Sequence, residues 1–314
     1  MTQYPKTLLE AITYFSNEAV CVTFLSKYRW SDGIPVCPHC GSKNVASLTS
    51  RPAYRCREKN CKKGFSLKTG SIMEDSPLPI TKWVPAIWFV INHKNGVSSC
   101  EVARALGITQ KSAWFMCHRI REAIQTAKIE KLKGAVECDE TYIGGKEYFK
   151  HRNNIPSSFR VRGHKNKSAV MGMLERGGVV GAQVVNSDGL KVLEPVVIEN
   201  IEEGSMLVTD QLGTYKLISQ RNNYKHESVS HSTKEYVRGH IHTNTLEGFW
   251  NLFKRSVKGT YTQIAPFHID RYLDEQVFRY NNRKTSDFGR FEQAVSQMFG
   301  KRLTYAELTG VVQA

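Results

Sequence analysis

The sequence has no long hydrophobic run. Its longest apolar stretch, residues 83–91, is nine residues long and contains Pro85, whereas a helix that crosses a bilayer needs about 20 apolar residues. The amino-terminal residues do not have the charged and then apolar layout of a secretory signal. Low-complexity tracts and repeats of fixed period are also missing. We therefore expect a folded, cytoplasmic protein with no membrane partner.

Acidic residues are few relative to basic ones. The 314 residues include 29 Asp and Glu against 44 Lys and Arg, which gives a formal net charge of +15. An excess of this size predicts a polyanionic partner, and nucleic acid is the first candidate. The chain is long enough to bury a core of ordinary size, in one large domain or in two or three small ones.

Four of the eight cysteines lie in two pairs. Two residues separate Cys37 from Cys40, four separate Cys56 from Cys61, and fifteen lie between the pairs. Reduced thiols in such pairs suit the tetrahedral coordination of Zn²⁺. The pattern predicts a zinc ribbon over residues 34–68 with one structural Zn²⁺, whose closed shell leaves no position for a catalytic water. The alternatives are two disulfides or four unrelated thiols.

Residues 98–124 show the pattern of two short helices. Ser98 or Ser99 can cap the first helix, Gly107 can end it, and Thr109 can cap the second. In a helix-turn-helix the second helix enters the major groove of DNA, although any αα-hairpin with glycine in its turn looks similar. The residues that would approach DNA are Gln110, Lys111 and Arg119.

From residue 133 the pattern changes to strands. We expect strands at 133–139, 169–174, 179–185, 205–210 and 225–229, and helices at 190–201, 214–220, around 247 and at 266–283. Three consecutive strands, then a helix, a strand and further helices make a mixed α/β plan. The domains we predict are 1–75 (helices and zinc ribbon), 76–132 (helix-turn-helix region), 133–300 (the mixed α/β domain) and 301–314 (carboxy-terminal tail).

Two of these predicted strands end in a carboxylate. Asp139 closes the first strand and Asp210 the fourth, and a carboxylate beside a buried strand is costly unless it is paired or binds metal. If the two strands are neighbours, both side chains project to one point, which Glu247 could reach from the start of a helix. Three carboxylates can hold two divalent ions about 3.5–4 Å apart, as in polymerases and nucleases. Oxygen ligands favour Mg²⁺ or Mn²⁺ over Zn²⁺.

Each of these acids also has a purely structural explanation. Asp139 can bond to a turn around Thr141, Asp210 can cap the following helix, and Glu247 can form a capping box with Asn244. Acids that compete for the third position are Glu137, Glu140, Asp270, Asp274 and Glu275. Because the side-chain period of a strand is two, Glu137 shares a face with Asp139, and we expect it to be a neighbour of the site.

At this point the motifs resemble those of a known family. The blocks are CPHC with CREKNC, VECDETYIGGKE, LVTDQLGTY, HTNTLEGFWNLFKRSVKGTY and RYLDEQVFRYNNR. They are similar in order and spacing to bacterial insertion-sequence transposases of the DDE type, in insertion sequence family 1595 (ISXO2-like), and the resemblance runs from about residue 18 to about residue 300. It implies a ribonuclease-H-like catalytic domain in which Asp139, Asp210 and Glu247 hold two Mg²⁺ or Mn²⁺. Thirty-six residues separate Asp210 from Glu247, close to the usual gap in the family.

The resemblance also implies an activity. Such an enzyme binds the terminal inverted repeats of its element, hydrolyses phosphodiester bonds at the element ends and joins the 3′-hydroxyl to target DNA. A homodimer or larger synaptic complex is expected because two ends must be joined together, and the bound protein would be associated with the nucleoid. Further residues that would contact DNA are Arg152, Arg162, Lys165, Trp250, Lys254, Arg255 and Lys258.

Several alternatives remain at this stage. The basic segment 146–167 could be only a solvated loop, and Trp250 could be a core aromatic residue instead of a surface on which a base stacks. For the whole protein, one alternative is a ribonuclease-H-like nuclease or resolvase without strand transfer. The other is a zinc-ribbon DNA-binding regulator with a vestigial catalytic domain.

Overall fold

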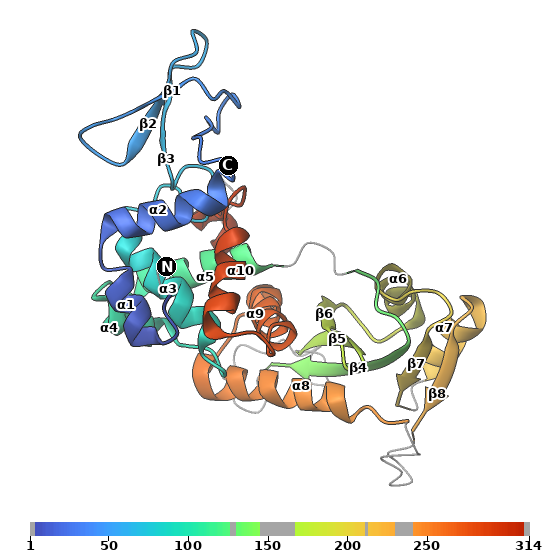
Figure 1. The fold of residues 1–314 in the computed structure, drawn as a ribbon. Coiled ribbons are helices and arrows are strands. Elements are labelled where there is room, and N and C mark those ends of the chain that lie inside the picture. The colour runs from blue at the N-terminus through green and yellow to red at the C-terminus, as the bar shows by residue number, and fades with distance from the viewer. Residues whose placement is uncertain (1–3, 126–129, 145–166, 211–212, 230–240, 311–314) are drawn as a thin grey trace. The chain divides into compact units, whose positions relative to one another are not determined.

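The computed structural model describes residues 4–125, 130–144, 167–210, 213–229 and 241–310 (Figure 1). The chain divides into two compact units, one formed by residues 1–125 and 284–314 and the other by residues 126–283. The expected start of the catalytic domain at residue 133 lies near this division. Its expected end at residue 300 does not, because residues 284–300 belong to the first unit.

The first unit is helical apart from a small sheet. Thr7 and Asn17 cap its first two helices with their side chains, as short polar residues do at helix starts. The helices are α1 (Leu8–Tyr14), α2 (Glu18–Arg29), α3 (Ile80–Asn92), α4 (Ser99–Leu106), α5 (Gln110–Ile124), α10 (Asp287–Ser296) and α11 (Tyr305–Thr309).

Helix α10 belongs to this unit because it packs against α3. The ring of Phe291 lies 5.2 Å from that of Trp88 and 5.7 Å from that of Phe24, measured between centroids. Arg290 Nε donates to Asn92 Oδ1 at 2.9 Å, and Asn92 Nδ2 donates to the carbonyl of Asp287 at 3.2 Å. Aromatic contact area and partly buried hydrogen bonds thus hold the carboxy-terminal segment on the amino-terminal helices.

The small sheet has the antiparallel order β1-β2-β3, formed by β1 (Val45–Ser47), β2 (Ala53–Cys56) and β3 (Gly64–Ser66). Tyr54 and Phe65 are cross-strand partners whose rings stack at 5.4 Å. These three short strands lie inside the residues predicted to form the ribbon, 34–68.

The predicted helical hairpin is present in the first unit. Ser98 caps α4 in a reciprocal capping box with Glu101, Gly107 ends α4 in the left-handed conformation (φ 59°), and Thr109 caps α5. Glycine has no Cβ, so it adopts this positive φ without strain. The turn therefore forms where the sequence placed it.

The second unit is built on a five-stranded sheet of order β6-β5-β4-β7-β8. Strands β4, β5 and β6 are successive antiparallel neighbours, and β7 and β8 are added in parallel on the other side of β4. The strands are β4 (Ala135–Ile143), β5 (Ser168–Glu175), β6 (Val180–Val185), β7 (Met206–Thr209) and β8 (Lys225–Ser228). The helices are α6 (Leu190–Asn200), α7 (Gly213–Arg221), α8 (Asn244–Arg255) and α9 (Ile269–Asn281), with a π-helical turn η5 (Ser256–Tyr261) and a 3₁₀ turn η6 (Pro266–His268).

Helices cover both faces of this sheet. Met171 and Met173 of β5 lie in a core with α6 and α7, whereas Val170 and Leu174 lie in a second core with α8 and α9. This follows from the alternation of side chains along a strand. In Figure 1, α8 runs along β4. The mixed α/β prediction is confirmed. The sheet, with β4 as its central strand, is the middle of three layers.

Strand β4 is longer than predicted. It continues past Asp139 to Ile143, because its antiparallel ladder with β5 extends to the pair Ile143 and Ser168. Only the parallel ladder with β7 stops early, at the pair Glu137 and Val208. Asp139 therefore does not end the strand, although it lies beyond the last residue that β7 covers.

Within the described residues, no single helix is long and apolar enough to span a membrane. The adjacent helices α1 and α2 reach that length and composition only as a pair bent by 102°. Phe15, Phe24 and Leu25 of this segment are buried in the first unit.

Candidate metal centres and nucleic-acid interface

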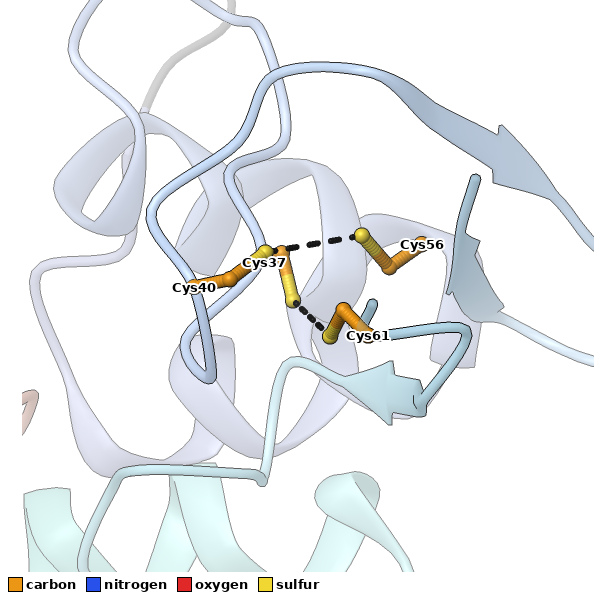
Figure 2. A group of neighbouring side chains, drawn as sticks. All are labelled: Cys37, Cys40, Cys56 and Cys61. Atoms are coloured by element: carbon orange, nitrogen blue, oxygen red, sulfur yellow. Dashed lines mark hydrogen bonds between the residues drawn. The ribbon is translucent and has the colours of Figure 1, made fainter. Parts of the chain in front are cut away.

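The four paired cysteines converge in the first unit (Figure 2). Cys37 Sγ lies 3.7 Å from Cys61 Sγ, Cys40 Sγ lies 3.6 Å from Cys56 Sγ, and all four sulfur atoms are within 4.8 Å of one another. A tetrahedral Zn²⁺ with Zn–S bonds of about 2.3 Å requires sulfur atoms roughly 3.8 Å apart. The observed spacing fits this requirement and is much longer than a disulfide bond, so the disulfide alternative is wrong.

The predicted acids on β4 and β7 come from neighbouring strands. The parallel ladder pairs Glu137 with Val208, and Asp139 and Asp210 each lie two residues beyond this pair. Glu247 is in the first turn of α8, which packs against β4. The topology therefore places the three distant segments that carry these carboxylates beside the central strand.

The negative charges of the neighbouring carboxylates affect the pKa of Asp139. Burial raises the pKa of Asp139 to about 6, and repulsion from Asp210 and Glu247 adds to the effect. The three sets of carboxylate oxygens are nevertheless not all within 4.8 Å of one another, unlike the cysteine sulfurs. An oxygen-rich group with unfavourable negative charge is chemically suited to a hard divalent cation.

The structure does not contain the turn that was the structural alternative for Asp139, or the capping box that was the alternative for Glu247. No turn forms at Thr141, which lies inside β4. Thr243, not Asn244, is the residue before α8, and it makes no side-chain capping bond. Its hydroxyl instead donates to Glu247 Oε1 at 3.2 Å.

Two of the competing acids have other partners. Glu275 forms a buried ion pair with Arg279 and accepts a hydrogen bond from Tyr261, and Asp270 accepts from the amide of Val184 at 3.2 Å. Both acids lie on α9.

Glu140 lies on the opposite face of β4 from Asp139. Burial raises its pKa to about 7, the neighbouring charges of Asp139, Asp210 and Asp188 add to the rise, and a hydrogen bond from Tyr215 opposes it.

Glu137 connects β4 to the start of α8. Its side chain is fully buried, and its two carboxylate oxygens accept hydrogen bonds from Arg176 Nε at 3.0 Å, Thr245 Oγ1 at 3.0 Å and the Leu246 amide at 2.9 Å. Anionic acceptors at a helix start also interact favourably with the helix dipole. The sequence placed Glu137 beside the site but contained no local signal for Arg176 or Thr245, because these partners come from other elements.

Trp250 is not on the surface. It is 3% exposed, and its Nε1 donates to Asp139 Oδ2 at 3.0 Å. The hypothesis that a DNA base stacks on this ring is wrong for this structure, because neighbouring groups cover it. The core-aromatic alternative describes its position.

The helical hairpin exposes part of the predicted DNA-contacting set. Gln110 and Lys111 are exposed at the start of α5, where Gln110 Nε2 donates to Ser99 Oγ at 2.9 Å. The prediction that Arg119 contacts DNA is wrong, because this residue is buried. It is 5% exposed, and its guanidinium donates to the carbonyls of Leu303 at 3.1 Å and Glu74 at 2.7 Å.

The basic residues that follow Glu247 lie on or just after α8. Lys254 is partly buried, whereas Arg255 and Lys258 are exposed. The remaining three candidates, Arg152, Arg162 and Lys165, lie outside the described residues.

The five-stranded sheet with its helical layers and acidic edge defines a ribonuclease-H-like domain, joined here to a zinc-ribbon unit. Sequence comparison agrees: residues 131–281 match the ISXO2-like transposase domain, and residues 16–64 match the transposase zinc-ribbon domain. The chain therefore contains a transposase zinc-ribbon domain followed by an ISXO2-like transposase domain.

The chain also has weaker similarity to individual proteins. An uncharacterised protein in transposable element ISH50 of Halobacterium salinarum is 26% identical over 283 residues, which cover 85% of this chain and 94% of that protein. The Mos1 transposase paired-end complex with left transposon end gives a TM-score of 0.24 at 10% identity, over 69% of this chain and 80% of that one. The simian T-cell lymphotropic virus intasome in complex with PP2A regulatory subunit B56 gamma gives 0.25 at 11% identity, over 72% and 69%.

Proposed function

We propose that this protein is an active DNA transposase that cleaves the ends of an insertion sequence and joins them to target DNA. The observation that supports the proposal is the β4–β7 pairing together with the packing of α8 on β4, which brings the segments that carry Asp139, Asp210 and Glu247 together. Burial is the chief cause of the raised pKa of Asp139, and the negative charges of Asp210 and Glu247, which raise it further, are charges that a bound cation would neutralise.

The three carboxylates would hold two Mg²⁺ or Mn²⁺ ions. Ions bound there would activate the attacking oxygen and stabilise the leaving oxygen during in-line displacement at phosphorus. The chain's own contribution is to place the acids: β4 and β7 fix the two aspartates, and the bonds of Glu137 to the first turn of α8 fix the helix that carries Glu247.

Two displacements complete the reaction. In the first, a water oxygen attacks the phosphorus at the element end, the P–O3′ bond breaks, and a 3′-hydroxyl and a 5′-phosphate result. In the second, the oxygen of that 3′-hydroxyl attacks a target phosphorus, and the target P–O3′ bond breaks as the new P–O bond forms. The proton of the attacking group passes to solvent, and no covalent protein–DNA intermediate is required.

Recognition of the element ends is proposed for the first unit. The zinc ribbon and the start of α5, with exposed Gln110 and Lys111, would contact the terminal repeats. Arg255 and Lys258 in the second unit would contact the DNA backbone, which agrees with the net charge of +15. Joining two ends together calls for a homodimer or a larger synaptic complex.

The test is a joining assay with precut element ends, supercoiled plasmid and Mg²⁺ or Mn²⁺. We expect the wild-type protein to join the ends and Asp139→Asn to bind them without joining. Asp270→Asn is the matched control, because this acid lies on α9 and accepts a bond from the Val184 amide; it should join normally.

Two results would support the alternative functions instead. Cleavage without joining by the wild-type protein would indicate a nuclease or resolvase. Equal behaviour of wild type and Asp139→Asn, with DNA binding retained and no cleavage, would indicate a regulator.

A further inference from the structure

A glycine of β5 makes room for an aromatic ring beside the acidic site. Gly172 is the residue that pairs with Asp139 across the β4–β5 ladder. A Cβ atom at this position would lie 2.4 Å from Cζ2 and 2.9 Å from Cη2 of Trp250, and 2.9 Å from Cδ1 of Leu246. The six-membered part of the indole therefore lies directly on the β5 backbone, where only glycine fits.

The same ring bonds to a proposed metal ligand. Trp250 Nε1 donates to Asp139 Oδ2 at 3.0 Å, and Trp250 is three residues after Glu247 on α8. Residues three apart share one face of a helix. One helix face thus carries both a carboxylate of the site and the donor that bonds to a second carboxylate.

We propose that Trp250 is a positioning residue of the acidic site, and that Gly172 is required for this role. The indole N–H holds the carboxylate of Asp139 in one orientation relative to Glu247, since the donor and Glu247 share a helix. This inference rests on the proposed metal-dependent function. Groups that orient metal ligands by hydrogen bonding typically change metal affinity by about 10- to 100-fold when they are removed.

The first test is Trp250→Phe in the full-length, zinc-loaded protein. Phenylalanine keeps an aromatic ring but removes the N–H donor, and we expect Mn²⁺ to bind about 10- to 100-fold more weakly. The probe is Mn²⁺ alone, followed by the electron paramagnetic resonance signal of the free ion. The matched control is Trp83→Phe, which removes a comparable indole bond, from Trp83 Nε1 to Ser76 Oγ at 3.1 Å, in the other unit. It should leave Mn²⁺ affinity unchanged.

The second test uses Gly172→Ala, which keeps the indole but removes its space. We expect Gly172→Ala to weaken Mn²⁺ binding in the same direction, because the new methyl group displaces the ring. Phenylalanine lacks the part of the ring that lies on Gly172. Adding Gly172→Ala to Trp250→Phe should therefore weaken Mn²⁺ binding by less than about threefold. Such non-additivity is typical of residues in contact.

The outcomes separate this inference from the proposed function. If Mn²⁺ binds neither wild type nor Asp139→Asn, or binds both equally, the proposed metal site is wrong. If wild type binds Mn²⁺, Asp139→Asn does not, and Trp250→Phe binds as wild type does, only the positioning role is wrong. Independent, multiplying effects of the two substitutions would also overturn it. If Trp250→Phe does not fold, Gly172→Ala alone decides, and unchanged affinity in a folded Gly172→Ala protein overturns the proposal.

Discussion

The buried carboxylate of Glu137 allows a direct test of how the second unit holds helix α8. Glu137→Gln preserves the size of the side chain but removes its charge and one of its two acceptor oxygens. In the wild-type protein Arg176 and Thr245 donate to Oε1, and the amide of Leu246 donates to Oε2. A glutamine cannot satisfy both sets of donors, because its NH₂ group must face one of them.

The expected cost follows from these bonds. Hydrogen bonds to a charged group each contribute about 1.5–3 kcal/mol, so losing at least one bond and the charge on the others should cost about 2–4 kcal/mol. Full burial of Glu137 means that water cannot replace the lost partners. A factor of ten corresponds to about 1.36 kcal/mol, so a helix start that opens more easily by about 2–4 kcal/mol exchanges its amide protons roughly 30- to 900-fold faster.

The assay is hydrogen exchange at the amide of Leu246 in the full-length protein, together with the unfolding free energy of the chain. Glu175→Gln is the matched control, because Glu175 accepts one bond, from the Lys133 amide at 3.0 Å, at an exposed position. Its effect should stay within about 0.5 kcal/mol. Exchange at Leu246 that is equally slow in wild type and Glu137→Gln would refute the claim that this carboxylate anchors α8.

Three further predictions concern pH, zinc and salt. The pKa of Asp139 is raised to about 6, chiefly by burial and then by Asp210. Between about pH 4 and 6 the folded state therefore holds more protons than the unfolded chain, and the free energy of unfolding should fall as pH rises. Without added metal, thermal unfolding at pH 8 should show Asp139→Asn to be more stable than wild type by up to about 3 kcal/mol. Cys37→Ala should abolish the one bound zinc per chain measured by atomic absorption, whereas Cys21→Ala, which removes a buried free thiol, should retain it. Arg255→Ala should lower the slope of log affinity against log salt by about one in a DNA-binding titration.

Much of the site could be predicted because its residues carry local signals. Paired thiols at short spacing indicate zinc without any knowledge of the fold, and Cys37 with its three partners converges as expected. Aspartates beside apolar strand residues also stand out locally, and the β4–β7 pairing places Asp139 and Asp210 each two residues beyond the pair Glu137 and Val208.

Other features depend on contacts that no local pattern contains. Strand β4 is longer than the strand expected to end at Asp139, because pairing with β5 continues it to Ile143. Arg119 is a cation on the second helix of the hairpin, which made it a candidate for DNA contact. Its guanidinium instead donates to the carbonyls of residues 74 and 303. Burial decides the role of such a cation, and burial depends on the carboxy-terminal segment, which is far away in the sequence.

The acidic site itself explains why its helix needs strong anchors. Burial raises the pKa of Asp139, and repulsion from Asp210 and Glu247 raises it further; the same repulsion opposes the approach of α8 to β4. The bonds of Glu137 to the first turn of α8, and the bond from Trp250 in its second turn to Asp139, act against this repulsion. A helix held at two successive turns keeps Glu247 close to like charges, because separation of the carboxylates would require both anchors to break. The geometry of the site is therefore maintained by residues beside the three acids, and substitutions at those residues should alter cation binding while leaving the acids themselves in place.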